Sequence, residues 1–488
     1  MAASAYFRRR PDLGENAAVF PVTSERLAIG LLFVVIAVLA CFAPAQSDTW
    51  WLLRAGEEIW HTGKIPLQDT YSHTAAGEYW PNHEWLTESV FYLLFRTGGM
   101  PLLTGACATV IVATWATSWR LMRGGFELRF ALFACSIATA ATAWAVRPQA
   151  FSMAAFVVTS ILLATGRAVW LPLLFLIWAN LHGAVAVGLV AIAGAGAAEL
   201  VRDRRVPWKL VAVAGLCGLA TLVTPLGTAL WSFIPASMER SRINQLIEWQ
   251  PPGADVMFWP FWALAAALPI ATVWRWRTVD SFTARLAGVA LATLPIAIQA
   301  MRNVPLFLLM ALPALTRLIE RQDASAVRRV LRGERVVVNT SVLGAAVVVA
   351  AGFVGLGWAA PAPRLGWQPI SPAAVAGIRG CDNPVYNTYG DGGVLIWFVR
   401  ERPVFIDNRQ DPYPMDLLRA NRHAETTGDY RWLFDTYGVR CVAVPTTSLL
   451  TGRLRKDTVW AERYTDPQWT VFTPNARVVA VGPLRPSR

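Results

Sequence analysis

The feature that most constrains this chain is a succession of long apolar segments separated by short polar loops. A helix satisfies its own backbone hydrogen bonds in lipid, so an apolar run of about 18 residues or more indicates a membrane-spanning helix. Of the 488 residues, 55% are hydrophobic and only 16% are charged, whereas a soluble domain is about a quarter charged. We therefore expect an α-helical polytopic membrane protein.

Eleven spans are predicted in the part of the chain before residue 360. The first is "LAIGLLFVVIAVLACFA" at 27–43. The others lie at 91–117, 130–146, 150–165, 169–182, 185–200, 210–223, 257–273, 282–300, 303–316 and 337–359. The segment 1–26 has the cationic flank of a signal peptide. No small-residue cleavage pattern follows the first span, so we expect a retained anchor.

The positive charges follow the predicted topology. Lys and Arg exceed Asp and Glu by 12, an excess that in a soluble protein would suggest nucleic-acid binding. With the N-terminus inside, the inner segments hold 21 basic residues and the outer loops hold 7. This is the positive-inside pattern. It predicts a cytoplasmic N-terminus, and membrane lipids rather than nucleic acid as the partner of these charges.

An odd number of spans places the C-terminus outside. The transmembrane domain is predicted at 27–360, with a long first outer loop at 45–90. From 361 to 488 the apolar runs shorten, which indicates a separate extracytoplasmic α/β domain. Its expected strands are "VLIWFV", "PVFID", "CVAVP" and "WTVFTP", and its expected helices are "MDLLRANRHAE" and "YRWLFDTYG". Cys381 and Cys441 belong to this domain, and their spacing does not decide whether they pair.

The first outer loop opens with "SDTWWLLRAGEEIWHTGKIP" at 47–66. Apolar residues at helical spacing predict a short amphipathic helix on the outer membrane surface, with Ser47 as N-cap and Gly63 after its last turn. Asp48 suits the first turn, where a carboxylate interacts favourably with the helix dipole. Simple capping and membrane anchoring is an alternative explanation of this helix.

The second half of the loop, "YWPNHEWLTESV", adds further ionisable groups. Asn82 is expected to cap a helix that runs into the second span. The two ends of the loop adjoin spans one and two, so Asp48 is expected near His83 and Glu84. Carboxylates at such a depth are costly unless they are paired, hydrated or used. These three residues are our candidate catalytic groups.

Four more polar residues fall at the outer ends of predicted spans: Arg147, His182, Glu248 and Arg302. Each has a simpler explanation on its own, since arginines snorkel to the interface and a buried histidine can pack between helices. Their common side is the stronger observation. It predicts a cavity open to the outside that suits a phosphate-bearing substrate, because arginine binds phosphate as a planar bidentate donor.

The order of these features resembles the bacterial membrane glycosyltransferases of the GT-C superfamily, in particular a large and poorly characterised bacterial branch. The matching segments are "SDTWWLLRAGEEIWHTGKIPLQDTYSHTAAGEYWPNHEWLTE", "RPQAFS", "LIWANLHGAVAVGL", "TPLG", "IEWQPP", "RNVPLF" and "VYNTYGDGGVLIWFVRERPVFIDNRQDPY". The first-loop segment is the most specific of them. The resemblance implies a bacterial inner-membrane enzyme. Its donor would be a polyprenyl-phosphate-linked sugar, and its acceptor a lipid, glycan or protein on the outer side.

The resemblance also implies roles for individual residues. Asp48 matches the acid that follows span one in the family, and would deprotonate the acceptor or hold a divalent cation, Mg²⁺ or Mn²⁺. His83 and Glu84 would assist, and would join Asp48 as ligands if a metal is bound. Arg147 or Arg302 would stabilise the leaving phosphate.

His182 and Glu248 are assigned to the same substrate and phosphate site. In the tail, Asp407 ends the expected strand "PVFID" and Arg409 follows it. They would contact the acceptor glycan, or else form a salt bridge inside the fold.

The chain departs from part of the superfamily's pattern, and other functions remain open. It has neither an adjacent DD or DE pair after span one nor a WWDYG-like tail motif, which disfavours oligosaccharyl transfer to Asn. One alternative is a lipid-linked glycan transporter or flippase, which predicts functional charges at mid-membrane depth. Another is a non-catalytic envelope-assembly protein, because a shared fold does not guarantee activity.

Overall fold

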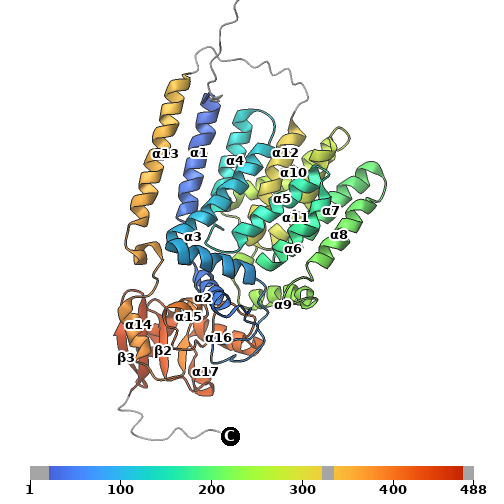
Figure 1. The fold of residues 1–488 in the computed structure, drawn as a ribbon. Coiled ribbons are helices and arrows are strands. Elements are labelled where there is room, and N and C mark those ends of the chain that lie inside the picture. The colour runs from blue at the N-terminus through green and yellow to red at the C-terminus, as the bar shows by residue number, and fades with distance from the viewer. Residues whose placement is uncertain (1–20, 321–334, 476–488) are drawn as a thin grey trace, which may run out of the picture.

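The computed structural model describes residues 21–320 and 335–475. A large helical bundle carries a smaller α/β domain at one of its ends (Figure 1). Most of the expected N-terminal segment 1–26 and of the basic loop 317–335 lies outside the described residues.

Every predicted span coincides with a helix. These helices are α1 (Ser24–Cys41), α3 (Trp85–Leu121), α4 (Phe126–Ala141), α5 (Gln149–Ala164), α6 (Leu171–Leu181), α7 (Val185–Asp203), α8 (Trp208–Ala220), α10 (Trp259–Arg275), α11 (Ser281–Gln299), α12 (Val304–Ile319) and α13 (Val336–Trp358). Within the described ranges, 7 helical segments are long and apolar enough to cross a membrane. The chain is thus a helical membrane protein, and the number of eleven spans stays a prediction.

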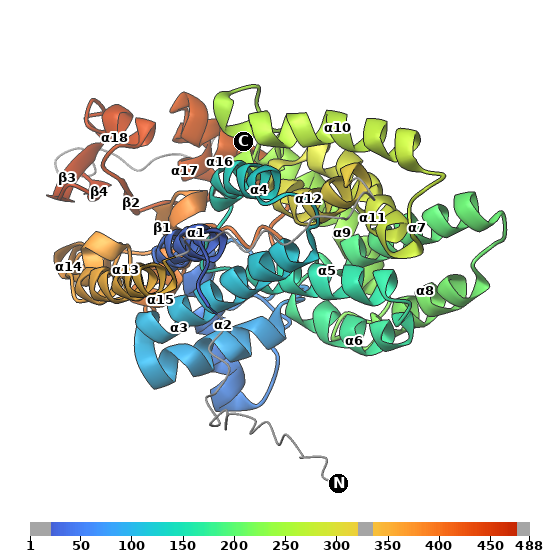
Figure 2. The same cartoon turned by 90° about the horizontal axis from the view of Figure 1, so that it is seen from above.

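Helix α12 forms the centre of the bundle. It is apolar on all sides and almost every residue in it is buried, as expected for a helix surrounded by other helices. Figure 2 shows it between α4, α10 and α11. Next to it, α7 and α11 cross closely at Gly194 and Gly288, where a Cβ on either glycine would collide with the backbone of the other helix. Small residues at such crossings let the helix backbones approach each other.

The long helix α3 is broken near its first third. Gly98 and Gly99 leave the helical conformation, with φ of 64° at Gly99, and Pro101 follows. The first part of α3 packs against α2 (Ser47–Thr62). Both α2 and α9 (Ala229–Ile243) lie where the bundle meets the α/β domain (Figure 1).

The expected surface helix 47–63 is present as α2, but it is not a free surface helix. Gly63 ends it in the left-handed conformation, as predicted, whereas the N-cap is Gln46 rather than Ser47. Trp50, Leu52 and Leu53 are fully buried. They are covered because α2 packs against both α3 and α15 (Gly392–Phe398) of the α/β domain. The amphipathic pattern predicted one apolar face, whereas α2 has buried residues on several sides.

The chain leaves α13 at Trp358, close to the predicted boundary at 361, and then forms the α/β domain. Its four strands are β1 (Val385–Asn387), β2 (Cys441–Pro445), β3 (Trp460–Thr465) and β4 (Trp469–Pro474). The sheet order is β1-β2-β4-β3, with β1 and β2 parallel and the other pairs antiparallel. The remaining helices are α14 (Pro372–Arg379), α16 (Met415–Thr427), α17 (Arg431–Thr436) and α18 (Leu449–Leu454).

Two of the four expected strands are wrong. The run "VLIWFV" lies in helix α15, and "PVFID" contributes only an isolated bridge between Val404 and Ser72 of the first outer loop. An apolar run of this length fits a buried strand or a buried helix equally well. The strands "CVAVP" and "WTVFTP" and both expected helices are confirmed as β2, β4, α16 and α17.

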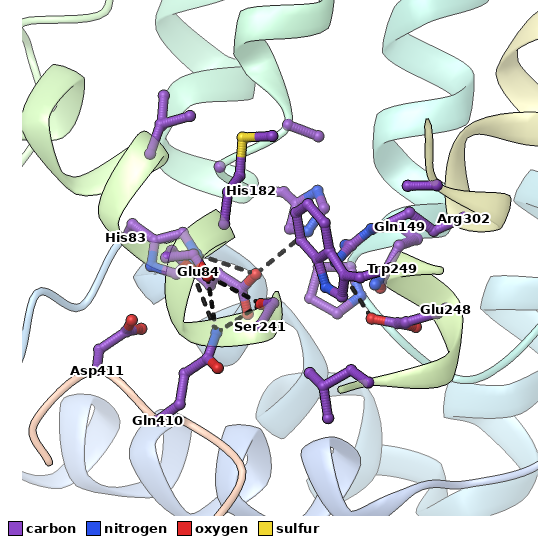
Figure 3. A pocket seen from close by; sticks show the side chains of 18 of the residues that line it. His83, Glu84, Gln149, His182, Ser241, Glu248, Trp249, Arg302, Gln410 and Asp411 are labelled. Carbon is purple, nitrogen blue, oxygen red and sulfur yellow. Dashed lines mark hydrogen bonds and ion pairs between the residues drawn. The ribbon is translucent and has the colours of Figure 1, made fainter. Parts of the chain in front are cut away.

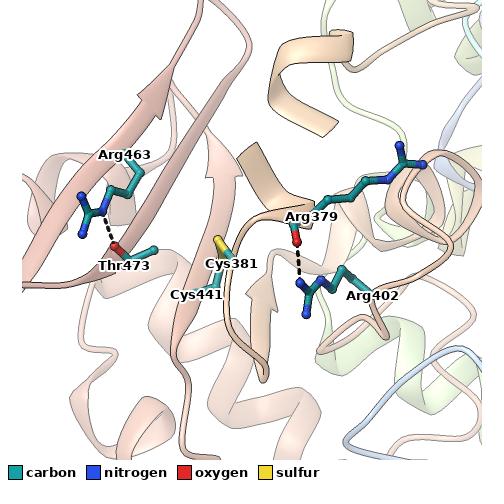
Figure 4. Close-up of a disulfide and its surroundings, with 6 residues drawn as sticks. All are labelled: Arg379, Cys381, Arg402, Cys441, Arg463 and Thr473. Atoms are coloured by element: carbon teal, nitrogen blue, oxygen red, sulfur yellow. Dashed lines mark hydrogen bonds between the residues drawn. A yellow bond between two sulfur atoms is a disulfide. The ribbon is translucent and has the colours of Figure 1, made fainter. Parts of the chain in front are cut away.

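The open question of the two cysteines has a structural answer. Cys381, just after α14, is disulfide-bonded to Cys441, the first residue of β2 (Figure 4). The bond joins the segment that enters the sheet to its second strand. Disulfides persist in oxidising compartments, which agrees with the predicted outer location of this domain.

Candidate functional site

All seven residues assigned to the catalytic and phosphate sites line one cavity of about 310 Å³. It lies at the junction of the bundle with the α/β domain. The residues are Asp48, His83, Glu84, Arg147, His182, Glu248 and Arg302. They come from six different segments of the chain. The sequence predicts them on the same side of the membrane, and the structure brings them together. Their roles in catalysis and binding stay predictions.

Four of these side chains form a continuous chain of opposite charges. Arg147 pairs with Asp48 through one guanidinium nitrogen and with Glu248 at 2.8 Å through another. Arg302 pairs with the other oxygen of Glu248 at 3.2 Å, and its guanidinium lies 4.4 Å from the ring centre of Trp249. Both arginine side chains are only 18% exposed. They are held in the cavity wall and do not snorkel into the interface.

Glu84 lies between two histidines on another wall of the cavity (Figure 3). Its Oε1 is 3.3 Å from Nε2 of His83 and 3.4 Å from Nε2 of His182. Burial raises the pKa of Glu84, but the neighbouring histidines and Arg147 more than offset this effect and lower the pKa to about 2. Glu84 is therefore ionised at neutral pH; it accepts a hydrogen bond from His83 and faces the ring of His182.

The two histidines hold different charges. Nδ1 of His83 faces the carbonyl oxygen of Pro81 at 3.2 Å, and its Nε2 faces Glu84, so both ring nitrogens donate to acceptors. Burial lowers the pKa of His83, but the Glu84 carboxylate more than offsets this and raises it to about 9. His83 is thus an imidazolium. Among the described residues the Ser152 hydroxyl has no other acceptor, so it donates to Nδ1 of His182; Nε2 then carries the one ring proton, and that ring is neutral.

A second layer of contacts fixes the tautomer of His182. Trp178 Nε1 donates to Ser152 Oγ at 2.8 Å, and Ser152 Oγ lies 2.7 Å from Nδ1 of His182. Since Nδ1 accepts the hydrogen bond from Ser152, Nε2 of the neutral His182 carries the proton that faces Glu84. The series Trp178–Ser152–His182 therefore orients the Glu84 carboxylate. Ser152 was missed from the sequence, although it ends the segment "RPQAFS" that supports the resemblance.

Asp48 is the candidate base, and its carboxylate is almost completely buried. Burial raises its pKa, and the carboxylates of Glu248 and Glu84 add to this, whereas Arg147 opposes it. One oxygen pairs with Arg147 and the other accepts a hydrogen bond from Nδ2 of Asn408. A carboxylate with a raised pKa is a better proton acceptor near neutral pH than an ordinary one.

Asn408 belongs to the α/β domain, so the site is built from both parts of the protein. Residues 408–411 form one wall of the cavity. Gln410 donates to Ser241 Oγ on α9 at 3.0 Å, with its own backbone in the left-handed region at φ of 55°. Asn408, Gln410 and Asp411 were not singled out from the sequence. The available signal was the polar run "DNRQD" directly after the apolar "PVFI".

Arg409 belongs to this wall, and Asp407 lies behind it. Their side chains are fully buried and form an ion pair at 2.6 Å, and Arg409 also pairs with Asp69 of the first outer loop at 2.5 Å. The salt bridge inside the fold, one of the two predicted possibilities, is therefore present. It ties the α/β domain to the loop that carries His83 and Glu84.

A second cavity of about 600 Å³ shares Asp48, Arg147, Glu248 and Arg302 with the first. Its other lining residues include Tyr389 and Arg422 of the α/β domain and Thr142 after α4. The chain of ion pairs thus has space on two sides, as a reaction between two substrates requires.

The residues proposed as metal ligands do not fit a cation in this arrangement. His83 uses both ring nitrogens as donors, so it has no lone pair for a metal. The Arg147 guanidinium is paired with Asp48, and its positive charge opposes a cation at that carboxylate. Within residues 21–320 and 335–475 there is no cluster of three or more His, Cys, Asp or Glu with the geometry of a metal site.

Comparison with known proteins adds no relative: no family model matches the chain, and no curated protein matches it.

Proposed function

We propose that this protein is a membrane glycosyltransferase that transfers a sugar from a polyprenyl-phosphate-linked donor to a lipid, glycan or protein acceptor. The observation that carries the proposal is the position of Asp48. A buried carboxylate with a raised pKa lies next to two arginines, at the end of a membrane bundle, between two cavities. A base, a pair of phosphate-binding groups and room for two substrates are what this reaction needs.

The proposed reaction is a displacement at the anomeric carbon. The acceptor hydroxyl oxygen forms a bond to that carbon while the bond from the carbon to the phosphate oxygen breaks. Asp48 accepts the hydroxyl proton, and polyprenyl phosphate leaves as an anion. Arg147 and Arg302 stabilise the developing charge on the phosphate, as preorganised donors do in other phosphate sites. Because phosphate is a good leaving group, no general acid is required.

The walls of the first cavity also suit a lipid-linked donor. Apolar side chains from α7, α9 and α11 line it beside the arginines: Val187, Val190, Ile234 and Ile296. A prenyl chain would lie along these helices while its phosphate meets Arg302 and Arg147. The charged groups gather at one end of the bundle rather than at its middle, which favours transfer over the transporter alternative.

We propose that this end faces the outside of a bacterial inner membrane, with the α/β domain extracytoplasmic. Two observations support this sidedness. The predicted inner loops hold most of the basic residues of the bundle, and the α/β domain carries a disulfide. The fold would then be an eleven-span GT-C-like bundle.

The test is transfer of radiolabelled sugar by the purified protein. A panel of polyprenyl-phosphate monosaccharides serves as donor, and an envelope extract from cells that contain the protein supplies acceptors. We expect transfer by the wild type and a loss of about 100-fold or more in Asp48→Asn. Asp416→Asn, at a carboxylate that is 96% exposed, is the matched control and should stay active. Addition of EDTA to the same assay tests the divalent cation.

Two results would overturn the proposal. If the wild type transfers sugar from none of the donors, the protein is not a transferase of this class. If Asp48→Asn is as active as the wild type, Asp48 is not the base.

A further inference from the structure

The α/β domain contributes one carboxylate to the cavity that has no bonding partner. Asp411 is 9% exposed, yet among the described residues its carboxylate makes neither a hydrogen bond nor an ion pair, and Oδ1 is completely covered. A buried carboxylate without a partner is costly and is rarely kept unless something satisfies it. Asp411 lines the cavity on the side of His83.

Two more acceptor oxygens in the same cavity lack a donor. The amide Nδ2 of Asn408 donates a hydrogen bond to Asp48, and Oδ1 of Asn408 is buried without a partner. Oε1 of Gln149, at the start of α5, is also buried without a partner. With the Asp411 carboxylate, three unpaired acceptor groups thus lie along one cavity. A phosphate cannot satisfy them, because at neutral pH it mainly accepts hydrogen bonds. A group with several hydroxyls can.

Asp411 and the arginines lie in different parts of the cavity. Figure 3 shows Asp411, Gln410 and His83 on one side, and Arg302, Glu248 and Trp249 on the other. The backbone of Gln410, next to Asp411, has a φ of 55°. Residues other than glycine rarely adopt this left-handed conformation. Strain of this kind persists where the surroundings fix it, and it is concentrated at functional sites.

We propose that residues 408–411 form a sugar-recognition loop, and that Asp411 accepts hydrogen bonds from hydroxyls of a neutral, polyhydroxylated sugar while excluding acidic sugars. This inference rests on the proposed function and assigns the sugar end of the donor to Asp411 and the phosphate end to the arginines. A sugar carboxylate has no hydrogen to donate to the three unpaired acceptor groups, so placing it against Asp411 would leave them unsatisfied. The loop also gives the α/β domain a function in the site.

The first measurement is equilibrium binding, which does not depend on turnover. Wild type and Asp411→Asn are titrated with bare polyprenyl phosphate and with the same lipid carrying a neutral hexose. We expect the hexose to increase the affinity of the wild type. Asp411→Asn should lower the affinity for the glycosylated lipid by about tenfold, because Asn keeps one acceptor oxygen but loses the second one and the charge that strengthens such bonds. Binding of bare polyprenyl phosphate should be unchanged, which also shows that the variant is folded.

The second measurement is donor selectivity in the transfer assay. Wild type should use the neutral hexose donor far better than the corresponding hexuronic-acid donor. Asp411→Asn should reduce this preference by about tenfold or more, because the amide N–H of Asn can donate to a sugar carboxylate. Asp416→Asn, an exposed carboxylate in the same domain, should keep the wild-type preference and the wild-type binding.

The outcomes distinguish this inference from the proposed function. Transfer by the wild type with identical binding and selectivity in Asp411→Asn would overturn the recognition loop and leave the transferase intact. An equal loss of affinity for both lipids in Asp411→Asn would also overturn it, since Asp411 would then stabilise the cavity and not bind the sugar. Absence of transfer with every donor counts against the proposed function itself.

Discussion

His83 and Glu84 are neighbours in the sequence, and their charges depend on each other. The cation of His83 exists because both of its ring nitrogens face acceptors, and the anion of Glu84 exists because two histidines and Arg147 surround it. Neither charge would be stable alone in a buried wall. The pair therefore links the stability of this wall to pH.

The pH dependence follows from the two pKa shifts. The pKa of His83 is raised from 6.5 to about 9, so its stabilisation is complete below pH 6.5 and is lost as the pH rises through about 9. The pKa of Glu84 is lowered from 4.5 to about 2, so its stabilisation is complete above pH 4.5 and is lost as the pH falls towards 2. The two contributions are both complete between pH 4.5 and 6.5.

We therefore expect the thermal unfolding temperature of the detergent-solubilised protein to fall by a few degrees between pH 6.5 and 9. His83→Gln should remove most of that slope, because Gln does not titrate. The control is His423→Gln, at a histidine that is 60% exposed, and it should keep the wild-type slope. Parallel slopes for wild type and His83→Gln would contradict the assigned charge.

At the level of helices and strands, the sequence predicted the helices of the bundle better than the strands of the α/β domain. Every apolar run placed in a span is helical, because lipid leaves a helix as the one way to satisfy such a backbone. In the α/β domain water is a competing partner, and the short run "VLIWFV" carries no period that separates strand from helix. It became α15 in contact with α2, which is a tertiary contact that no local pattern contains.

The residues of the site also differ in whether the sequence could predict them. The ionisable residues of the first outer loop and of the span ends could be predicted, because such groups are exceptional so close to apolar spans and the topology puts them on one side. Asn408 and Asp411 could not, because polar residues are ordinary in an α/β domain. Only the docking of that domain on α2 and α9 brings them into the cavity.

The docking of α15 on α2 depends on one glycine beside Asp48. The backbone N–H of Gly393 donates to Ser47 Oγ at 3.2 Å, and a Cβ at this position would collide with the backbone of Ser47. Gly393→Val should push α15 away from the start of α2 and displace Asp48. We expect transfer to fall by about 100-fold, as for a misplacement of about 1 Å in other enzymes.

The matched control is Gly452→Val in α18 of the same domain, where a Cβ would meet open space. Sugar transfer and unfolding temperature are measured for both variants. Wild-type transfer in Gly393→Val would show that the close approach of α15 to α2 does not position Asp48.

On the scale of the whole molecule, the bundle and the α/β domain each supply an incomplete site. The bundle holds the arginines and the apolar wall, and the α/β domain holds Asn408 and Asp411 against Asp48. The buried contacts of Arg409 with Asp69 and Asp407 fix the two parts together. The cavity therefore lies at the end of the bundle that carries the α/β domain, and the side of the membrane that this end faces decides which substrates can reach it.

Sidedness can be measured with two matched aspartates at opposite ends of the bundle. Helix α7 begins at the cavity and ends at Asp203, about 28 Å away at 1.5 Å per residue. Asp203 is 62% exposed, and Asp416 in the α/β domain is 96% exposed. Asp203→Cys and Asp416→Cys are made in a background without the four free cysteines of the described chain, Cys41, Cys107, Cys135 and Cys217.

Spheroplasts of a bacterial expression host are treated with a membrane-impermeant maleimide, before and after lysis. We expect Asp416→Cys to be labelled in intact spheroplasts and Asp203→Cys only after lysis, because the positive-inside pattern places the α7–α8 loop in the cytoplasm. The reverse labelling would put the cavity on the cytoplasmic side. The Cys381–Cys441 bond would then lie in a reducing compartment, where such bonds are rare, and a donor presented outside could not reach Asp48.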